Sequence, residues 1–276
     1  MEKRVIFSDD ATLVDFSVNA NKYESGTDPM VFVSADDYLY IGSRQPFNSA
    51  FFKMGVANTN ASTMSVSYWD GDNWVAMVDI LDETVGLTAD GNVTWYPDLD
   101  TSWHREHTNY NGETITGLSS VVIYNQYWVR IGFSADFSAG TTLRFVGNIF
   151  CDDDDIYSEF PDFRQTQVLT SFEAGKTDWE EQRVKASTML VQDLISKKII
   201  DGSGQILNRA DYAEACVMKT AEVIFRTFGD DFVDQKMEAR KEYNARLTKR
   251  VHRVDLNNNA IEDGKESKNE TGFLNR

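Results

Sequence analysis

Hydrophobic and polar residues alternate along the first part of the chain with the period of two that β-strands require. The clearest case is the stretch 63–80, where serines alternate with Met64, Val66 and Tyr68. Asp70-Gly71-Asp72 then interrupts the alternation, and Trp74 resumes it. Because glycine accepts the positive φ of a tight turn, Asp-Gly between two alternating runs predicts a β-hairpin.

Further short runs in this part have the same strand character and are bounded by Gly, Asp, Asn or Ser. They are Met30–Ser34, Tyr38–Gly42, Val121–Phe133 and Thr141–Phe150. Asp90-Gly91 and Asn111-Gly112 repeat the turn signal. About eight short strands with no helix between them predict an all-β sandwich or jelly roll.

The period becomes helical in the second part of the chain. Thr177-Asp178-Trp179-Glu180 matches a capping box, which predicts a helix that begins there and ends before Asp201. A second helix is predicted over Ala210–Phe228, closed by Gly229. A third is predicted from about Asp231 to Val254. This part therefore reads as a bundle of about three helices.

The change of period near residue 160 coincides with a change in composition. Five of the six tryptophans and all four prolines lie at or before Pro161. We therefore predict an α+β protein of two domains: an N-terminal β-sandwich at 1–158, a C-terminal α-helical bundle at 159–254 and an extended C-terminal tail at 255–276.

Charge separates the same two parts. The chain has a net charge of −17, and residues 1–165 hold 25 acidic against 9 basic residues, whereas residues 166–276 hold 19 against 18. An acidic surface repels phosphate, so the first part is a poor candidate for nucleic-acid binding. No apolar run has the length of a signal peptide or a membrane span.

The basic residues concentrate in the third predicted helix. They are Lys236, Arg240, Lys241, Arg246, Lys249, Arg250 and Arg253. Such a helix can bind nucleic acid, a membrane surface or an acidic protein neighbour, and the alternative is a solvated amphipathic face.

Aromatic residues of the first part allow a carbohydrate-binding interpretation. Exposed rings stack on sugar faces, and Trp95, Trp103 and Trp128 are the candidates for such contacts. The alternative is that these rings fill the space between two sheets.

Acidic residues after the third helix resemble a calcium loop of the EF-hand kind. Oxygen donors occupy the spacing of that loop at Asp255, Asn257, Asn259, Asp263 and Glu266. Ala260 stands where such a loop has glycine, and no helix is predicted after it. A docking or disordered tail is therefore the alternative interpretation.

Other clusters of polar residues favour structural explanations. His104-Arg105-Glu106-His107 lacks a further nearby histidine or cysteine to complete a metal site, and a polar loop is expected. Asp152–Asp155 is interpreted as a solvated connector after the last strand. Cys151 and Cys216 fall in different predicted parts, so no disulfide framework is expected, and a reducing compartment fits. We expect no cofactor and no catalysis.

The helical part resembles a known family. A capped helix, a Gly-rich turn, the stretch Asn208–Gly229, a long Lys/Arg helix with Tyr243 and an extended tail are similar to head-to-tail adaptor (connector) proteins of tailed bacteriophages. That resemblance covers about residues 165–265. It implies a homo-oligomeric ring, usually of twelve subunits, between the portal protein and the next neck or tail protein, with genomic DNA passing through the lumen without sequence-specific binding.

The resemblance also implies roles for residues. Portal or ring contacts, or the lumen surface, would fall to Arg240, Lys241, Arg246, Lys249, Arg250, Arg253 and the tail from Asp255. Many simple adaptors lack an N-terminal sandwich, which here would decorate the neck. The expected protein is a structural component of the virion neck, assembled in the host cytoplasm without a membrane partner. The alternatives are a carbohydrate-binding adhesin and, last, a glycan hydrolase.

Overall fold

The chain is a mixed α+β protein that divides into two compact units. A computed structural model describes residues 3–10, 12–34, 36–97, 103–106, 115–118, 121–123, 125–249, 252–261 and 267–268. The first unit comprises Met1–Gly147 with Asp255–Asp263, and the second comprises Asn148–Val254 with Gly264–Arg276. Among the described residues, no helix combines the length and the apolar character needed to cross a bilayer.

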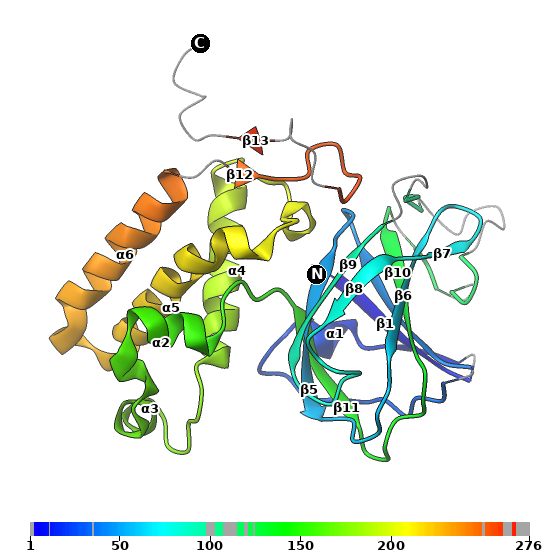
Figure 1. The fold of residues 1–276 in the computed structure, drawn as a ribbon, viewed down its shortest axis with the longest axis horizontal. Helices are drawn as coiled ribbons and strands as arrows, with labels where there is room; N and C mark the ends of the chain where they lie inside the picture. The colour runs from blue at the N-terminus through cyan, green and yellow to red at the C-terminus, as the bar shows by residue number, and fades with distance from the viewer. Residues whose placement is uncertain are drawn as a thin grey trace, which may run out of the picture. The chain divides into compact units, whose positions relative to one another are not determined.

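The described part of the first unit contains strands and one short helix (Figure 1). Its elements are β1 (Lys3–Asp9), β2 (Thr12–Asp15), α1 (Ser17–Ala20), β3 (Asp28–Pro29), β4 (Tyr38–Ser43), β5 (Ser49–Val56), β6 (Met64–Trp69), β7 (Trp74–Ala76), β8 (Val78–Asp82), β9 (Gly91–Tyr96), β10 (Tyr127–Phe133) and β11 (Thr142–Gly147). They form two antiparallel sheets. One sheet has the order β2-β1-β4-β10-β6-β7, and the other has the order β3-β11-β5-β9-β8.

Aromatic rings connect the two sheets through the interior of this unit. Trp103 lies 5.7 Å from Tyr68 of β6 and 5.8 Å from Phe47, measured between ring centroids. The ring of Phe47 is in turn 5.5 Å from Trp95 of β9. One continuous series of rings therefore spans from a strand of one sheet to a strand of the other.

The six-stranded sheet is buried on both faces along its central strands β1, β4 and β10. Its second face carries Ile6, Tyr40 and Trp128, and segments 115–118 and 121–123 pack their apolar side chains against them. The ring of Trp128 lies on Gly42 of the neighbouring strand, where an added Cβ would come within 2.8 Å of it. Because both faces are covered there, β1, β4 and β10 are buried almost continuously, whereas β6 keeps the alternation of Met64, Val66 and Tyr68 with serines.

The predicted hairpin is confirmed. β6 pairs with β7 in antiparallel register, with Trp69 opposite Trp74. The Asp70 carboxylate accepts hydrogen bonds from the amides of Asp72 and Asn73, and Gly71 has a φ of 114°. These hydrogen bonds hold the pKa of Asp70 below its usual value, because they favour the ionised form.

The strand predicted at Met30–Ser34 is wrong, because side chains occupy its amides. Asp37 accepts from the amide of Val33 at 2.7 Å, and Asp136 accepts from the amide of Ser34 at 2.8 Å. Backbone donors already bonded to carboxylates are not available to a neighbouring strand. The paired strand β3 ends at Pro29.

The described part of the second unit is helical apart from a two-residue ladder. Its elements are α2 (Asp153–Glu159), η1 (Pro161–Arg164), α3 (Thr166–Phe172), α4 (Glu180–Ser196), η2 (Ser203–Gln205), η3 (Arg209–Tyr212), α5 (Ala213–Phe228), η4 (Asp230–Phe232), α6 (Val233–Thr248), β12 (His252–Arg253) and β13 (Ser267–Lys268). The prediction of about three helices is not confirmed, because α2 and α3 precede the three long helices.

The interpretation of Asp152–Asp155 as a solvated connector is wrong. Asp152 caps α2: its carboxylate accepts from the amide of Asp155, whose own carboxylate accepts from the amide of Asp152. Asp153 forms an ion pair with Arg183 of α4 at 2.9 Å. Negative charge in the first turn also suits the positive end of the helix dipole. The acidic run therefore begins a helix and fastens it to α4.

The capping box predicted at Thr177 is also absent. The Thr177 hydroxyl donates to Asp178, and Asp178 accepts from the amide of Glu180 at the start of α4. Asp178 thus takes the role expected of Thr177. At the other end of the bundle, Gly229 closes α5 with a φ of 88°, as predicted.

The boundary between the units lies earlier than the predicted one at residue 158. Phe150 and Cys151 are buried in the helical core, together with Trp179, Leu190 and other apolar residues of α4 and α5. Their burial assigns the segment after β11 to the second unit. The predicted tail is also divided, since Asp255–Asp263 belongs to the first unit.

Candidate interaction surface and cavity of the helical unit

Helix α6 buries one narrow face. Ala239, Tyr243 and Leu247 are at most 4% exposed, and α6 packs against α5 through them. Met237 of the same helix is 62% exposed. The helix ends at Thr248 and not near Val254. The fully buried face therefore covers little more than two helical turns, and most other residues of α6 are exposed or half-buried.

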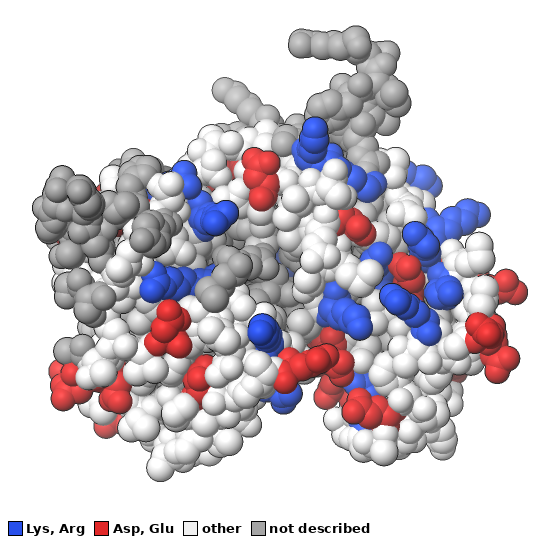
Figure 2. All heavy atoms as spheres, turned by 180° about the vertical axis from the view of Figure 1, so that it is seen from behind, with Lys and Arg blue, Asp and Glu red and all other residues white. Residues whose placement is uncertain are grey.

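The solvent side of α6 carries basic side chains. Lys241 and Lys249 are exposed, and the Arg240 side chain is 71% exposed with only a distant carboxylate, Glu222, at 4.0 Å. Figure 2 shows Lys and Arg side chains gathered over the helices of this unit. Arg253 pairs with Asp211 at 3.3 Å. Arg250 lies outside the described residues. Lys236 is half-buried, so Arg240, Lys241 and Lys249 are the described basic residues of α6 and its C-cap that are exposed.

Arg246 differs from these residues although it belongs to the same basic series. Its guanidinium donates to Glu159 of α2 at 2.7 Å and lies 3.7 Å from Glu214 of α5. Its side chain is 25% exposed. Arg246 therefore joins three helices of its own unit, and its charge is already matched there.

A buried polar network connects α4, α5 and α6. Lys219 of α5, 6% exposed, lies 3.5 Å from Asp193 of α4, 3.2 Å from Glu222 and 4.5 Å from the centre of the Tyr243 ring. The Tyr243 hydroxyl donates to Asp193 at 2.7 Å. Burial, and then this hydrogen bond, raise the pKa of Tyr243. The network fixes the register of α4, α5 and α6.

The helical unit also contains a cavity of about 650 Å³ walled by phenylalanines. The rings come from the end of α2, from η1, from the last turns of α5 and from η4. They are Phe160, Phe163, Phe225, Phe228 and Phe232. Phe160 stacks on Phe163 at 5.3 Å, and Phe228 lies 5.3 Å from Phe232. A volume of this size is typical of small-molecule or side-chain pockets.

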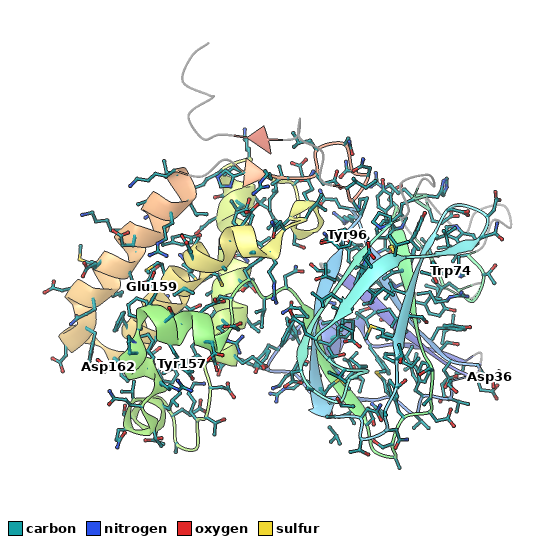
Figure 3. All side chains as sticks on the ribbon, viewed as in Figure 1. Asp36, Trp74, Tyr96, Tyr157, Glu159 and Asp162 are labelled. Carbon is teal, nitrogen blue, oxygen red and sulfur yellow. The ribbon has the colours of Figure 1, made fainter. Side chains whose placement is uncertain are left out.

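Polar residues stand at the edge of this cavity. Glu159 and Asp162, both labelled in Figure 3, are part of its lining, together with Gln165 and Gln235. The Asp162 carboxylate accepts a hydrogen bond from the side-chain amide of Gln165 at 2.7 Å, and Glu159 forms an ion pair with Arg246. The cavity thus has apolar walls with a polar, partly acidic rim.

Sequence reasoning did not identify this cavity. Phe225, Phe228 and Phe232 recur at helical spacing at the end of α5 and just beyond it. This apolar spacing continues past the end of α5 at Gly229. The continuation is the sequence pattern that could have indicated the cavity. Phe160 and Phe163 carry no such signal, because the turn around Pro161 that brings them to the stripe has no period.

The tryptophans proposed for sugar stacking are core residues. Trp95 and Trp128 are 0% exposed and Trp103 is 9% exposed. The indole of Trp95 donates to the carbonyl of Phe47 at 2.9 Å. Buried rings offer no face to a sugar, so this interpretation of the three residues is wrong. Trp95 and Trp103 pack with Phe47 in the interior between the sheets, and Trp128 packs under the segments 115–118 and 121–123.

Asp255 is fully buried at the start of the candidate calcium loop. Its carboxylate accepts from the amides of Asn259 and Ala260, at 3.1 and 2.8 Å. Burial raises its pKa, and these amides oppose that rise. Asn257 is exposed. Asp263 and Glu266 lie outside the described residues. In the part that is described, the loop's own amides are therefore among the partners of the Asp255 oxygens.

The remaining metal candidates are dispersed. His104 packs on Gly71, and Glu106 accepts from the indole of Trp69 at 3.1 Å. His107 is not among the described residues. Where the structure describes the chain, no three His, Cys, Asp or Glu side chains converge in a way that would hold a metal ion. In comparisons with protein families, with curated proteins and with solved structures, no match to this chain is found.

Proposed function

We propose that this protein is a structural virion protein: a head-to-tail adaptor that forms a ring beneath the portal and links the capsid to the tail. The helical unit, with α4, α5 and α6 as its three-helix bundle, would form the ring around the passing DNA. The first unit, a β-sandwich of the jelly-roll kind, would be a peripheral module of the neck.

One observation carries this proposal. Helix α6 is anchored by three residues on one side and presents Arg240, Lys241 and Lys249 to solvent on the other. A helix held firmly by its own unit, with exposed basic groups facing outward, suits contact with an acidic neighbour or with DNA phosphates. The strongly acidic first part would be repelled by the same DNA.

Arg246 is excluded from that contact surface, although the resemblance included it. Its guanidinium already has two carboxylate partners, Glu159 and Glu214. Reversal of its charge would place three negative groups together and disturb the fold. A test of the contact surface therefore needs the other basic residues of α6.

The proposal is tested on the assembly state of the purified chain. We expect light scattering after size-exclusion chromatography and negative-stain imaging to show a closed ring, alone or with the portal protein of the same genome. A variant with Arg240→Glu, Lys241→Glu and Lys249→Glu should lose the ring or the portal contact and keep its circular dichroism spectrum, since exposed charges contribute little to stability.

A matched variant controls for net charge. Lys22→Glu, Lys185→Glu and Arg226→Glu change the charge equally at exposed positions outside α6. This variant should assemble as the wild type does. A chain that stays monomeric at all concentrations and ignores the portal contradicts the adaptor proposal. The adhesin alternative predicts reproducible binding on a glycan array, which the adaptor proposal does not.

A further inference from the structure

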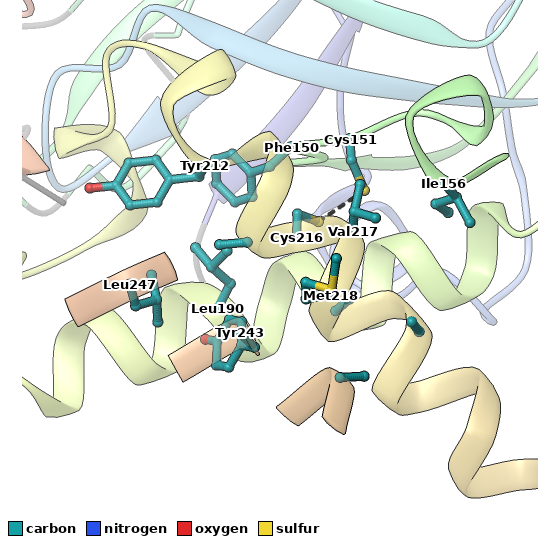
Figure 4. Close-up of a cluster of buried hydrophobic side chains, with 14 of the residues drawn as sticks. Phe150, Cys151, Ile156, Leu190, Tyr212, Cys216, Val217, Met218, Tyr243 and Leu247 are labelled. Atoms are coloured by element: carbon teal, nitrogen blue, oxygen red, sulfur yellow. Dashed lines mark hydrogen bonds between the residues drawn. The ribbon is translucent and has the colours of Figure 1, made fainter. Parts of the chain in front are cut away.

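The two cysteines of the chain meet inside the helical unit (Figure 4). Cys151 precedes α2 and Cys216 lies in α5, and their sulfur atoms are 3.1 Å apart. This distance is shorter than that of two sulfur atoms in van der Waals contact. A disulfide bond, with its length of about 2.05 Å, requires roughly 1 Å of further approach. The sequence alone had assigned these cysteines to different domains.

The surroundings distinguish the two thiols. Ser187 Oγ accepts from the amide of Phe150, so its hydroxyl hydrogen is available to donate to Cys216 Sγ at 3.3 Å. The hydrogen bond to Cys216, with burial, raises the pKa of Cys151. Burial opposes ionisation of Cys216, but the hydrogen bonds from Cys151 and Ser187 outweigh it and lower its pKa. Cys216 is therefore the better thiolate, and Cys151 keeps its proton.

We propose that Cys151 and Cys216 form an intramolecular disulfide by exchange with a low-molecular-weight disulfide such as oxidised glutathione. The Cys216 thiolate attacks one sulfur of oxidised glutathione, the S–S bond breaks, and one glutathione leaves and takes up a proton. Cys151 then loses its proton and attacks the Cys216 sulfur of the mixed disulfide, which releases the second glutathione. Two protein thiols are oxidised, and one oxidised glutathione is reduced to two thiols.

The position of the bond gives it a mechanical consequence. It would tie the irregular segment after β11 to α5, the helix that packs against both α4 and α6. The bonded residues are 65 positions apart. A cross-link that closes a loop of this length restricts the unfolded chain and stabilises the fold. This inference does not depend on the adaptor proposal, because it concerns the chain by itself.

The test begins with the folded, reduced protein. It is incubated with oxidised glutathione, denatured, alkylated with iodoacetamide and weighed by intact-mass spectrometry. We expect a chain without alkylated cysteine, two hydrogens lighter than the reduced chain, and a Tm higher by about 5–10 °C. The matched variants Cys151→Ala and Cys216→Ala should carry one glutathione or one alkyl group, without a rise in Tm between reduced and oxidised samples.

Cys151 and Cys216 are at most 2% exposed, which limits the access of glutathione to their sulfur atoms in the folded protein. A second experiment removes this limit by starting from the denatured chain. The denatured chain is refolded with a mixture of reduced and oxidised glutathione, and native folding is verified by circular dichroism. The proposal is supported if the refolded monomer contains the 151–216 cross-link in its peptide map. It is overturned if the natively refolded chain retains two alkylatable thiols, or if disulfides form only between chains.

Discussion

The two units treat their aromatic residues in opposite ways. In the first unit, Trp95 and Trp128 are completely buried and no ring of the inner series faces solvent. In the second unit, Phe160, Phe228 and Phe232 are only partly buried and surround a cavity of about 650 Å³. Among the described residues, these tryptophans of the first unit lie in a packed core, whereas phenylalanines of the second unit line a partly open cavity.

This difference shows that the number and size of aromatic residues do not predict where a ligand-sized space lies. Two facing sheets have a wide gap that large rings must fill. Helices that meet at their ends leave irregular space, because the ends diverge while the middles pack. The ends of α2 and α5, together with η1 and η4, line such a space, which is partly open to solvent.

The largest loss of stability is expected in the first unit. Trp95→Ala should lower the free energy of unfolding by about 3–5 kcal/mol, because it leaves a cavity in a packed interior and removes the hydrogen bond to Phe47. Urea denaturation followed by circular dichroism measures this loss.

Phe232→Ala is the corresponding substitution at the cavity of the second unit. Its ring is half-buried and already borders empty space, so we expect a loss of roughly 1 kcal/mol or less. Equal losses in the two variants would contradict the contrast between a packed core and a partly open cavity.

A second prediction concerns the ion pair that fastens α2 to α4 in the second unit. Asp153→Ala should cost about 2 kcal/mol, because it leaves Arg183, 9% exposed, without its carboxylate partner. Asp154→Ala, the next residue of the same acidic run, is exposed and should change stability by less than about 0.5 kcal/mol. Thermal unfolding of both variants measures the difference, and similar shifts in Tm would show that α2 is not fastened by this pair.

Sequence patterns predicted those features that depend on local chemistry. The Asp70–Asp72 hairpin and the end of α5 at Gly229 were predictable because turn geometry requires particular residues. The start of α4 was misassigned because Thr177 and Asp178 offer alternative caps, and only the folded chain selects one. The cavity and the pairing of Arg246 depend on segments distant in sequence, and no local pattern records them.

A third prediction tests the polar network of the second unit. Tyr243→Phe should cost about 1 kcal/mol at pH 7, since it removes the hydrogen bond to Asp193. The raised pKa of Tyr243 means that, above about pH 10, the unfolded chain loses this proton and the folded chain does not. The contribution of the protonated Tyr243 hydroxyl to the free energy of unfolding is therefore complete below about pH 10 and is lost as the pH rises above it. Urea titrations between pH 7 and pH 11 should show the advantage over the variant shrinking.

The smallest expected effect separates two basic residues of α6 that the sequence treats as equivalent. Arg246→Ala should lower stability by roughly 0.5–1 kcal/mol, because the guanidinium is 25% exposed and contacts carboxylates of two other helices. Lys249→Ala should have almost no effect, since Lys249 is exposed at the end of the helix. Screening in 1 M salt should reduce the Arg246 effect and leave Lys249 unchanged. An equal loss of stability in the two variants at low salt would mean that the charges of both Arg246 and Lys249 stabilise the fold. Lys249 would then not belong to the outward basic face of α6.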